Sequence, residues 1–468
     1  MSRTAFKAAG GSLGESRWVR FPCAPAIYMD HLTDRGQLVE ALAAGHRPRE
    51  EWALGLEFEQ FVTGPDCLPR QYSGLGGVEE LLRELGARTG WGLVCEEGRV
   101  LGLSAPDGRA VTLEPGAQLE FGSRPEKTLK ALEIQLQEYC GHLKCLAEER
   151  SVRFLAVGAH PTASPEDMER IPKRRYDFLE PVLREASDLG LWMMRCTAGI
   201  QVNFDHADEE DAMRKLRMTF ALSPVVCALF ANSGVRAGSA SGFASWRGHV
   251  WTRTDPARCG IPEPLVRPGA VFEDYVNWML DVPMVFLRRA GVWVDPGGRS
   301  FREHFDSGEA TAEDWDLHLS SPFPEARFRP QIELRCADTA SPAMALALCA
   351  LVKGWFYDDE ALDNLERVVG EWSHAQIVEA WEAGHRSGLA APGPGGKSLL
   401  EHARNVVSLA RLNSLEDSWL NPIRHLLDEG RSRGELQADW AEEDIRKALK
   451  KLADDAGCGR FAPSGNPF

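Results

Sequence analysis

The most informative segment of the chain is Gly55-Leu56-Glu57-Phe58-Glu59-Gln60-Phe61. Because side chains alternate between the two faces of a strand, a strand here sends Glu57 and Glu59 to one face and Leu56 and Phe58 to the other. Neighbouring carboxylates repel each other unless a cation or water separates them. This pair alone therefore fits a solvated outer face as well as it fits a divalent-metal site.

Three further segments repeat the alternation, and each adds polar side chains to one face. The segment 111–121 reads as two short strands around the turn Pro115-Gly116, and the other two are 197–204 and 331–335. The polar faces of these segments carry Thr112, Glu114, Gln118 and Glu120, then Thr197, Gln201 and Asn203, and finally Glu333 and Arg335. The pattern predicts a largely antiparallel sheet with one apolar face and one polar face.

The polar face is either half solvated or the wall of a cavity for an anion and a metal ion. Its carboxylates are accompanied by neither histidine nor clustered cysteine, so hard oxygen ligands predominate. Such ligands favour Mg²⁺ or Mn²⁺ over Zn²⁺. The ligand set does not separate the first two ions, because both accept carboxylate oxygens.

Composition narrows the class of protein. A formal net charge of −16 over 468 residues argues against a nucleic-acid partner, because phosphate binding needs a basic surface. No apolar run reaches the roughly 18 residues of a membrane span, and the N-terminal residues lack the apolar stretch of a signal peptide. Eleven cysteines without CxxC spacing predict reduced thiols and a cytoplasmic location.

Hydrophobic periodicity predicts helices between and after these strands. The expected helices cover 78–88 and 126–150, and a third covers 209–220 and restarts at Ser223-Pro224. The last hundred residues, 343–451, are helix-forming with little strand signal. Strands in the first three quarters, long helices between them and a helical end predict an α+β fold.

Domain boundaries are weakly marked in the sequence. The glycine-rich stretches 234–242 and 390–397 read as loops of a single body, not as linkers. We therefore expect one domain over 26–450, between an N-terminal extension over 1–25 and a C-terminal tail over 451–468.

Two basic segments are candidates for anion binding. The loop 245–258 places Arg247, Arg253 and Arg258 between aromatic residues, and the arginine fork suits carboxylate and phosphate oxygens. Surface ion pairs are the alternative role for these arginines. For the run Lys173-Arg174-Arg175, a solvated face is the favoured interpretation.

Taken together and in order, these motifs resemble the plant and proteobacterial type of glutamate–cysteine ligase. The resemblance covers about residues 31–440 and is carried by Gly55-Leu56-Glu57-Phe58-Glu59, Leu113-Glu114-Pro115-Gly116, Ile171-Pro172-Lys173-Arg174-Arg175-Tyr176, Gln201-Val202-Asn203, Leu229-Phe230-Ala231-Asn232-Ser233, 251–258, 280–284, His318-Leu319-Ser320 and Glu333-Leu334-Arg335. It implies a glutamine synthetase-like fold. In that fold a curved antiparallel sheet has a polar face forming a funnel for ATP, metal and glutamate, and helices on its other face.

The resemblance also implies an activity. ATP would phosphorylate the γ-carboxylate of glutamate, and the amine of cysteine would attack the resulting acyl phosphate. Phosphoryl transfer is mainly a problem of positioning and charge neutralisation, which Mg²⁺ or Mn²⁺ and arginines provide. The expected partners are therefore ATP, glutamate and cysteine or another amine, with no nucleic acid and no membrane. The oligomeric state stays open.

Roles follow for individual residues of this chain. The metal-ligand candidates are Glu57, Glu59, Glu114, Glu120 and Glu333. The candidates for binding the γ-phosphate and the carboxylates of glutamate are Arg247, Arg258 and Arg335, with Arg335 favoured for the transferring phosphoryl group. The candidates for the substrate pocket are Thr197, Gly199, Gln201, Asn203, Gln331 and, as a wall, Trp251.

The chain departs from the family pattern at two places on this face. The family usually has an arginine and then Thr-x-Thr before Gln-Val-Asn, and this chain has Cys196-Thr197-Ala198-Gly199. The family usually has Arg-Tyr before the glutamate, and this chain has Pro330-Gln331, with Cys336 following Arg335. Lost hydroxyl groups would alter the pocket and not the scaffold.

Three functions compete. The leading one is glutamate–cysteine ligation, and the second is ligation of glutamate or another carboxylic acid to a different amine. The third is a nucleotide- or metabolite-binding protein on the same scaffold, without turnover. The joint presence of Glu57, Glu59, Glu333 and Arg335 favours an enzyme, because a binding protein has little need for so many clustered carboxylates.

Overall fold

The computed structural model describes residues 31–455. The predicted N-terminal extension over 1–25 lies outside the described residues, and so does most of the predicted tail over 451–468. Residues 451–455 form the end of the last helix.

The largest sheet of the described chain has nine strands. Eight of them follow the order β14-β15-β7-β1-β5-β4-β3-β2. The ninth, β6, pairs with residues 61–63 of β1, after the residues of β1 that pair with β7. All of its pairings are antiparallel. Its strands are β1 Leu54–Thr63, β2 Gly92–Glu96, β3 Arg99–Ser104, β4 Ala110–Leu113, β5 Leu119–Gly122, β6 Arg153–Leu155, β7 Gly199–Phe204, β14 Ala326–Phe328 and β15 Ile332–Asp338. The predicted antiparallel sheet is confirmed, and each strand segment singled out in the sequence belongs to it.

Three two-stranded pairings complete the strands of the described part. They are β8 Val235–Arg236 with β9 Ser239–Ala240, β10 Cys259–Gly260 with β13 Phe323–Pro324, and β11 Leu287–Arg289 with β12 Val292–Val294. The glycine-rich stretch 234–242 thus contains a short hairpin.

Register explains why the polar side chains share one face. Residues directly opposite each other on paired strands point to the same side of a sheet. Glu59 pairs with Glu120 on β5, Glu57 pairs with Gln201 on β7, and Glu333 pairs with Asn203. The predicted alternation is therefore confirmed across the strands, and it builds one continuous polar face.

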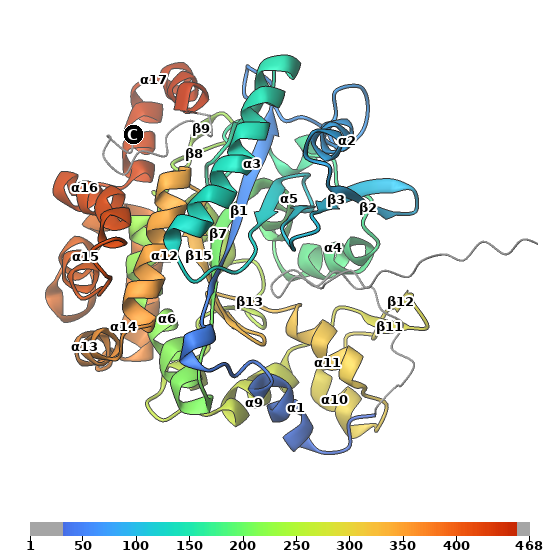
Figure 1. Cartoon of the computed structure of the whole chain (residues 1–468), viewed down its shortest axis with the longest axis vertical. Coiled ribbons are helices and arrows are strands. Elements are labelled where there is room, and N and C mark those ends of the chain that lie inside the picture. Colours follow the sequence, from blue (N-terminus) through green and yellow to red (C-terminus); the bar gives the residue numbers. More distant parts are fainter. Residues whose placement is uncertain (1–30, 456–468) are drawn as a thin grey trace, which may run out of the picture.

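Apolar side chains of the same strands form the other face and are buried. Leu56, Phe58, Val202, Phe204 and Leu334 are all at most 1% exposed. The helix α12 packs against β1 and β7, and α6 packs against β15 (Figure 1). The helices thereby remove the apolar face from water, which is the main force that holds the sheet in place.

The helices carry most of the remaining chain. They are α1 Arg35–Ala43, α2 Val78–Thr89, α3 Leu129–Arg150, α4 Arg175–Ala186, α5 Gly190–Cys196, α6 Glu209–Leu229, α7 Trp246–Thr252, α8 Glu263–Val266, α9 Phe272–Asp281, α10 Phe301–Asp306, α11 Ala312–Leu319, α12 Pro342–Phe356, α13 Asp359–Val369, α14 His374–Ser387, α15 Leu399–Ser408, α16 Asn421–Glu429 and α17 Arg433–Asp455. Short 3₁₀ turns cover Arg49–Glu51, Pro165–Asp167, Gly388–Ala390, Pro394–Gly396 and Asp417–Leu420.

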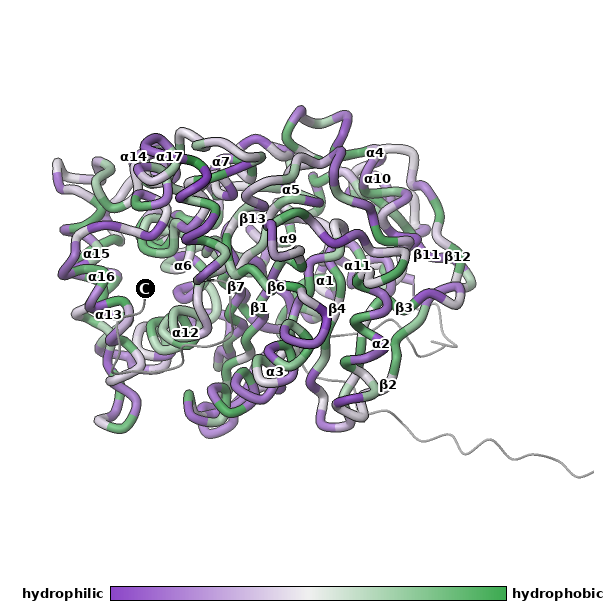
Figure 2. The backbone as a smooth tube through the Cα atoms, turned by 90° about the horizontal axis from the view of Figure 1, so that it is seen from above, coloured by the Kyte–Doolittle hydropathy of each residue, from purple (hydrophilic) through white to green (hydrophobic). Residues whose placement is uncertain are grey.

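The predicted helical end of the chain is confirmed, because α12 to α17 occupy this part of the described residues. Seen from above, α13, α15 and α16 lie on the far side of α6 and α12 from β1 and β7 (Figure 2). The mixture of an antiparallel sheet and helices confirms the predicted α+β class. Within the described residues, no helix combines the length and apolar character needed to cross a bilayer.

Two helix predictions need correction. The predicted break at Ser223-Pro224 is wrong, because α6 runs without interruption from Glu209 to Leu229. Proline removes one helical hydrogen bond, but residues 218–229 are all buried, so packing on both sides outweighs that loss. The second helix starts at Leu129 instead of 126, because Thr128 caps it and Glu126 is already paired with Leu54.

Phe58 provides a test of which face is buried. Phe58 is fully buried under the helices, so Phe58→Ala should lower the free energy of unfolding by about 3 to 5 kcal/mol through lost burial and the cavity left behind. Chemical denaturation measures this change. The control is Leu75→Ala, because Leu75 is 98% exposed and its loss should change stability by at most about 0.5 kcal/mol. Equal effects of the two substitutions would contradict this assignment of the faces.

Candidate active site

The polar face of the sheet is one wall of a cavity. The predicted site residues that line this cavity are Glu57, Glu59, Glu114, Glu120, Thr197, Gln201, Arg247, Trp251, Glu333 and Arg335. They come from β1, β5, β7, α7 and β15, from the turn after β4 (Glu114) and from the residue after α5 (Thr197), and these segments are widely separated in the chain. The sheet brings them together.

Charge changes sign across the sheet. The carboxylates of Glu57, Glu59 and Glu120 lie on β1 and β5, and Glu114 follows β4. On the other side of β7, the strands β14 and β15 carry Arg327 and Arg335. A cavity with carboxylates on one side and arginines on the other is suited to an anionic ligand that binds together with a cation.

The carboxylates of β1 resist ionisation. Burial, followed by repulsion from Glu333, raises the pKa of Glu57 to about 7. Burial, followed by repulsion from Glu114, raises the pKa of Glu59 to about 7. Glu120 is affected in the same direction, because burial and three neighbouring carboxylates raise its pKa well above the usual value. Bound cations would remove this repulsion.

Amide groups of β7 support the two β1 carboxylates. Asn203 donates to Glu57 over 2.9 Å, and Gln201 Nε2 donates to Glu59 over 2.6 Å. The backbone N–H of Gly199 also donates to Glu59, over 2.6 Å. Within residues 31–455, the Oε1 atom of Gln201 is buried and has no hydrogen-bond partner. A buried oxygen beside clustered carboxylates fits a hard divalent cation.

Glu333 differs from the other four carboxylates. It accepts from Arg327 Nε over 2.7 Å and from Arg335 Nη1 over 3.0 Å. Burial alone would raise the pKa of Glu333, but Arg327 and Arg335 outweigh burial and lower it. Glu333 is therefore ionised and holds two arginines at the cavity wall.

Three further arginines of the cavity were not predicted as site residues from the sequence. Arg327 and Arg329 both line it, and so does Arg175. Arg327 and Arg329 alternate with Phe328 as the carboxylates do elsewhere, and this alternation could have revealed them. For Arg175, the favoured solvated role is wrong, because the start of α4 directs this residue to the cavity.

Two arginines lie close to Trp251. The Cζ atom of Arg335 is 5.5 Å from the centre of the Trp251 ring, and that of Arg247 is 5.8 Å away. Burial and the nearby charge of Arg327 lower the pKa of Arg335, although arginine stays charged throughout the physiological range. This crowding of positive charge favours an anionic ligand.

Four predicted site residues do not line the cavity. Arg258 is 1% exposed and donates to Asp255 over 2.5 Å and to the carbonyl of Pro283 over 3.2 Å, so its charge is already paired. Asn203 acts on the cavity through Glu57. Gly199 and Gln331 are buried, and neither contributes to the lining. Tertiary packing around each residue, which the strand pattern does not encode, accounts for these differences.

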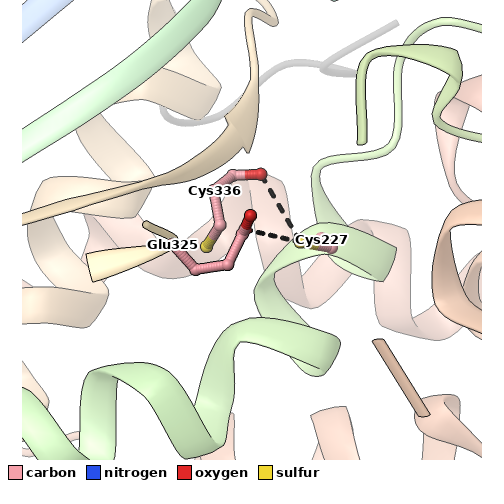
Figure 3. Close-up of side chains that lie close together, drawn as sticks. All are labelled: Cys227, Glu325 and Cys336. Atoms are coloured by element: carbon pink, nitrogen blue, oxygen red, sulfur yellow. Dashed lines mark hydrogen bonds between the residues drawn. The ribbon is translucent and has the colours of Figure 1, made fainter. Parts of the chain in front are cut away.

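A second polar cluster, Cys227, Glu325 and Cys336, lies outside the cavity lining (Figure 3). The Cys227 thiol is 3.8 Å from a carboxylate oxygen of Glu325 and 3.5 Å from the carbonyl oxygen of Cys336. Burial raises the pKa of Cys227 well above the usual value and that of Glu325 to about 7. The hydrogen bond from the Cys227 thiol to the Cys336 carbonyl joins α6 to β15, and a thiol with a raised pKa is a poor nucleophile.

Comparison with known proteins identifies the relatives of this chain. It is 34% identical over 423 residues to the chloroplastic glutamate–cysteine ligase of Brassica juncea, covering 87% of this chain and 81% of the relative. It is 33% identical over 423 residues to the chloroplastic enzyme of Arabidopsis thaliana, covering 87% and 80%. For glutamate–cysteine ligase A of rice, Oryza sativa subsp. japonica, the identity is 33% over 381 residues, covering 80% and 76%.

Solved structures support the fold. The glutamate–cysteine ligase of Francisella tularensis, solved in complex with AMP, matches with a TM-score of 0.53 at 13% identity, covering 86% of this chain and 87% of that one. The model of glutamate-cysteine ligase family 2 matches residues 53–453, which include every residue of the cavity lining. The chain therefore belongs to glutamate-cysteine ligase family 2, as the order of its motifs predicts.

Proposed function

We propose that this protein is an ATP-dependent ligase that joins the γ-carboxylate of glutamate to the amine of cysteine. The product would be γ-glutamylcysteine. The observation that carries the proposal is the meeting of buried carboxylates and arginines in one cavity of a family 2 chain. The named activity of the relatives supports the choice of glutamate and cysteine.

The reaction has two steps. The γ-carboxylate oxygen attacks the γ-phosphorus of ATP, so that ADP leaves and γ-glutamyl phosphate forms. The amine nitrogen of cysteine then attacks the acyl carbon, inorganic phosphate leaves, and the nitrogen loses a proton. The first step is limited by charge repulsion between two anions, so catalysis depends on neutralising and aligning them.

The arginines of the cavity would do this for the anionic substrates. Arg335 and Arg327 are fixed by Glu333 at the wall, and Arg329 and Arg175 line the same cavity. Planar guanidinium groups bind phosphate and carboxylate oxygens with two parallel hydrogen bonds. Arg335, beside Trp251, is the residue we assign to the transferring phosphoryl group.

Mg²⁺ or Mn²⁺ would bind on the opposite side of the cavity. Glu57, Glu59, Glu114 and Glu120 would hold it, with Glu333 completing the predicted set at the arginine side. When bound, the metal supplies charge neutralisation for the phosphate oxygens. The raised pKa values of Glu57 and Glu59 and the unpartnered oxygen of Gln201 support this assignment.

The two departures from the family pattern bear on the choice of amine. Gly199 and Gln331 are the departures that favoured a different amine, and neither lines the cavity. Any influence of these two residues on the choice of amine would therefore be indirect, and the choice of cysteine rests on the named activity of the relatives. Thr197 is present at the wall, where its hydroxyl donates to the carbonyl of Met193 over 2.6 Å.

Other features stay part of the proposal. We infer that the polar face is the funnel of a glutamine synthetase-like sheet and that 26–450 is one catalytic domain. A cytoplasmic location remains a prediction from the sequence. The non-catalytic alternative is tested directly by turnover.

Turnover is the first test. Purified protein with ATP, Mg²⁺ and glutamate should release phosphate in a cysteine-dependent manner and produce γ-glutamylcysteine, detected by mass spectrometry. A panel of other amines is the control for substrate choice. If phosphate release requires another amine, that amine would replace cysteine as the proposed substrate. Absence of turnover with every amine would contradict a ligase.

Glu333→Gln tests the arginine clamp. The variant keeps the size of the side chain but removes the charge that holds Arg327 and Arg335. We expect kcat to fall by roughly 10² to 10³, the usual consequence of losing one preorganised group at a charged transition state. Steady-state kinetics measure the effect, and circular dichroism checks the fold. A near-normal kcat would remove Glu333 from the site.

Glu59→Gln tests the metal side through pH. In the folded wild type without divalent ions, the raised pKa of Glu59 means that ionisation between about pH 4.5 and 7 destabilises the protein. The Tm of the variant minus that of wild type should therefore increase by several degrees from pH 5 to pH 8. Calorimetry measures this difference, and a pH-independent difference would contradict it.

The same pair of proteins tests metal binding. Added Mg²⁺ at pH 8 should raise the Tm of wild type and raise that of Glu59→Gln less, because a ligand that binds the folded state stabilises it. An equal rise in both proteins would place the metal away from Glu59.

A further inference from the structure

A bulge in β15 presents Arg335 to the cavity. The register between β15 and β7 shifts between Leu334 and Ala337, so Arg335 and Cys336 occupy the irregular position. Bulges bend a strand and redirect side chains, and they are frequent next to active sites. The orientation of Arg335 therefore depends on whatever holds the backbone of this bulge.

The guanidinium of Arg247 holds it. Arg247 Nη2 donates to the carbonyl oxygen of Arg335 over 3.0 Å, and Nη1 donates to that of Cys336 over 3.3 Å. One charged side chain thus binds two successive carbonyl groups of the bulge. Charge-assisted hydrogen bonds are roughly twice as strong as neutral ones, so this clamp fixes the bulge firmly.

The backbone of Arg247, in the first turn of α7, is also fixed by hydrogen bonds. Its backbone N–H donates to Ser233 Oγ over 3.1 Å, and Ser233 Oγ donates to Asp338 over 2.6 Å. Ser245, which caps α7, donates to the other oxygen of Asp338 over 2.8 Å. The Nη1 atom of Arg247 lies 3.9 Å from Asp338. The start of α7 and the end of β15 are therefore joined through one carboxylate.

Gly199 leaves the space that the guanidinium occupies. It lies on β7 directly opposite Asp338. A Cβ atom at Gly199 would lie 2.5 Å from Arg247 Nη2, 3.0 Å from Cζ and 3.2 Å from the carbonyl oxygen of Ala337. The first distance is far below any normal contact, whereas the backbone of Gly199 is outside the left-handed region. The requirement for glycine is therefore one of space and not of backbone conformation.

We propose that Gly199 is a positioning residue that acts through Arg247. By leaving room for the guanidinium, it lets Arg247 bind both carbonyl groups of the bulge and so directs Arg335 into the cavity. This proposal deepens the proposed function, on which it rests for the role of Arg335. It also gives Gly199 a role although it is absent from the cavity lining.

Gly199→Ala is the variant that tests it. The added methyl group would meet mainly the end of the Arg247 side chain and, less closely, the carbonyl oxygen of Ala337, so the protein should fold with the guanidinium displaced. Because a misplacement of about 1 Å at a reacting group can cost about 10²-fold, we expect kcat to fall roughly 10- to 100-fold. The KM values for glutamate and ATP should change much less than kcat. The matched control is Gly92→Ala at the start of β2, where a Cβ atom would meet only Ser104 O at 3.7 Å.

A double-mutant cycle shows whether the effect runs through Arg247. Arg247→Ala should lower activity by itself, and adding Gly199→Ala in that background should change kcat by less than 3-fold, roughly the error of an uncoupled pair. Equal fold-changes caused by Gly199→Ala with and without Arg247 would overturn the proposal. An unchanged kcat in the single variant Gly199→Ala would overturn it as well.

The same cycle measured by unfolding does not depend on activity. Gly199→Ala should destabilise the protein when Arg247 is present and have little effect when residue 247 is alanine. A crystal structure of Gly199→Ala should show the guanidinium moved away from the carbonyl oxygens of Arg335 and Cys336. An unmoved guanidinium or additive unfolding free energies would contradict the clamp. If wild type lacks turnover, the proposed function fails, and these two measurements still decide whether Gly199 positions Arg247.

Discussion

Repulsion between buried carboxylates is the constraint on which this site depends. Glu59 and Glu120 face each other across β1 and β5, and Glu57 lies two residues away on the same face. Burial removes the water that would screen them, which is why ionisation of all three is disfavoured. Such an arrangement costs stability in the free protein, and a divalent cation bound here would offset that cost. This stored free energy supports the proposal that a divalent metal binds here.

On the same face of the sheet, the strands on the other side of β7 carry positive charge. Arginines from β14 and β15 crowd together, and Glu333 neutralises part of their charge. The amide-bearing strand β7 separates the two sides and supports the carboxylates through Gln201 and Asn203. The two charged sides would face cations and anions of one complex. Because β7 lies between them, the carboxylates of β1 and β5 do not pair directly with the arginines of β14 and β15, whereas Glu333 on β15 does.

The positions of site residues could be predicted from the sequence where they depend on a local rule, such as the alternation of side chains along a strand. Alternation placed Glu57, Glu59, Glu120 and Glu333 on one face, and pairing in register brought them together. Prediction from sequence failed for Pro224, because propensity describes an isolated helix and α6 is buried on all sides over that stretch. Arg327 and Arg329 followed the same alternation and could have been found by the same rule. For Arg258, ion pairing was the alternative role, and the fold of the loop decided for it by placing Arg258 against Asp255, three positions earlier.

The amino-acid sequence by itself determined the family, the α+β class and the polar strand faces, because these depend on motif order and on a period of two along each strand. Tertiary structure alone decided which arginines reach the cavity and what Gly199 does. Arg247 and Gly199 lie 48 positions apart in the sequence. No periodic pattern in the sequence links α7, which carries Arg247, to the bulge of β15 that Arg247 binds. Contacts of this kind are set by how elements pack, so they appear only when the strands, α7 and the bulge are in place.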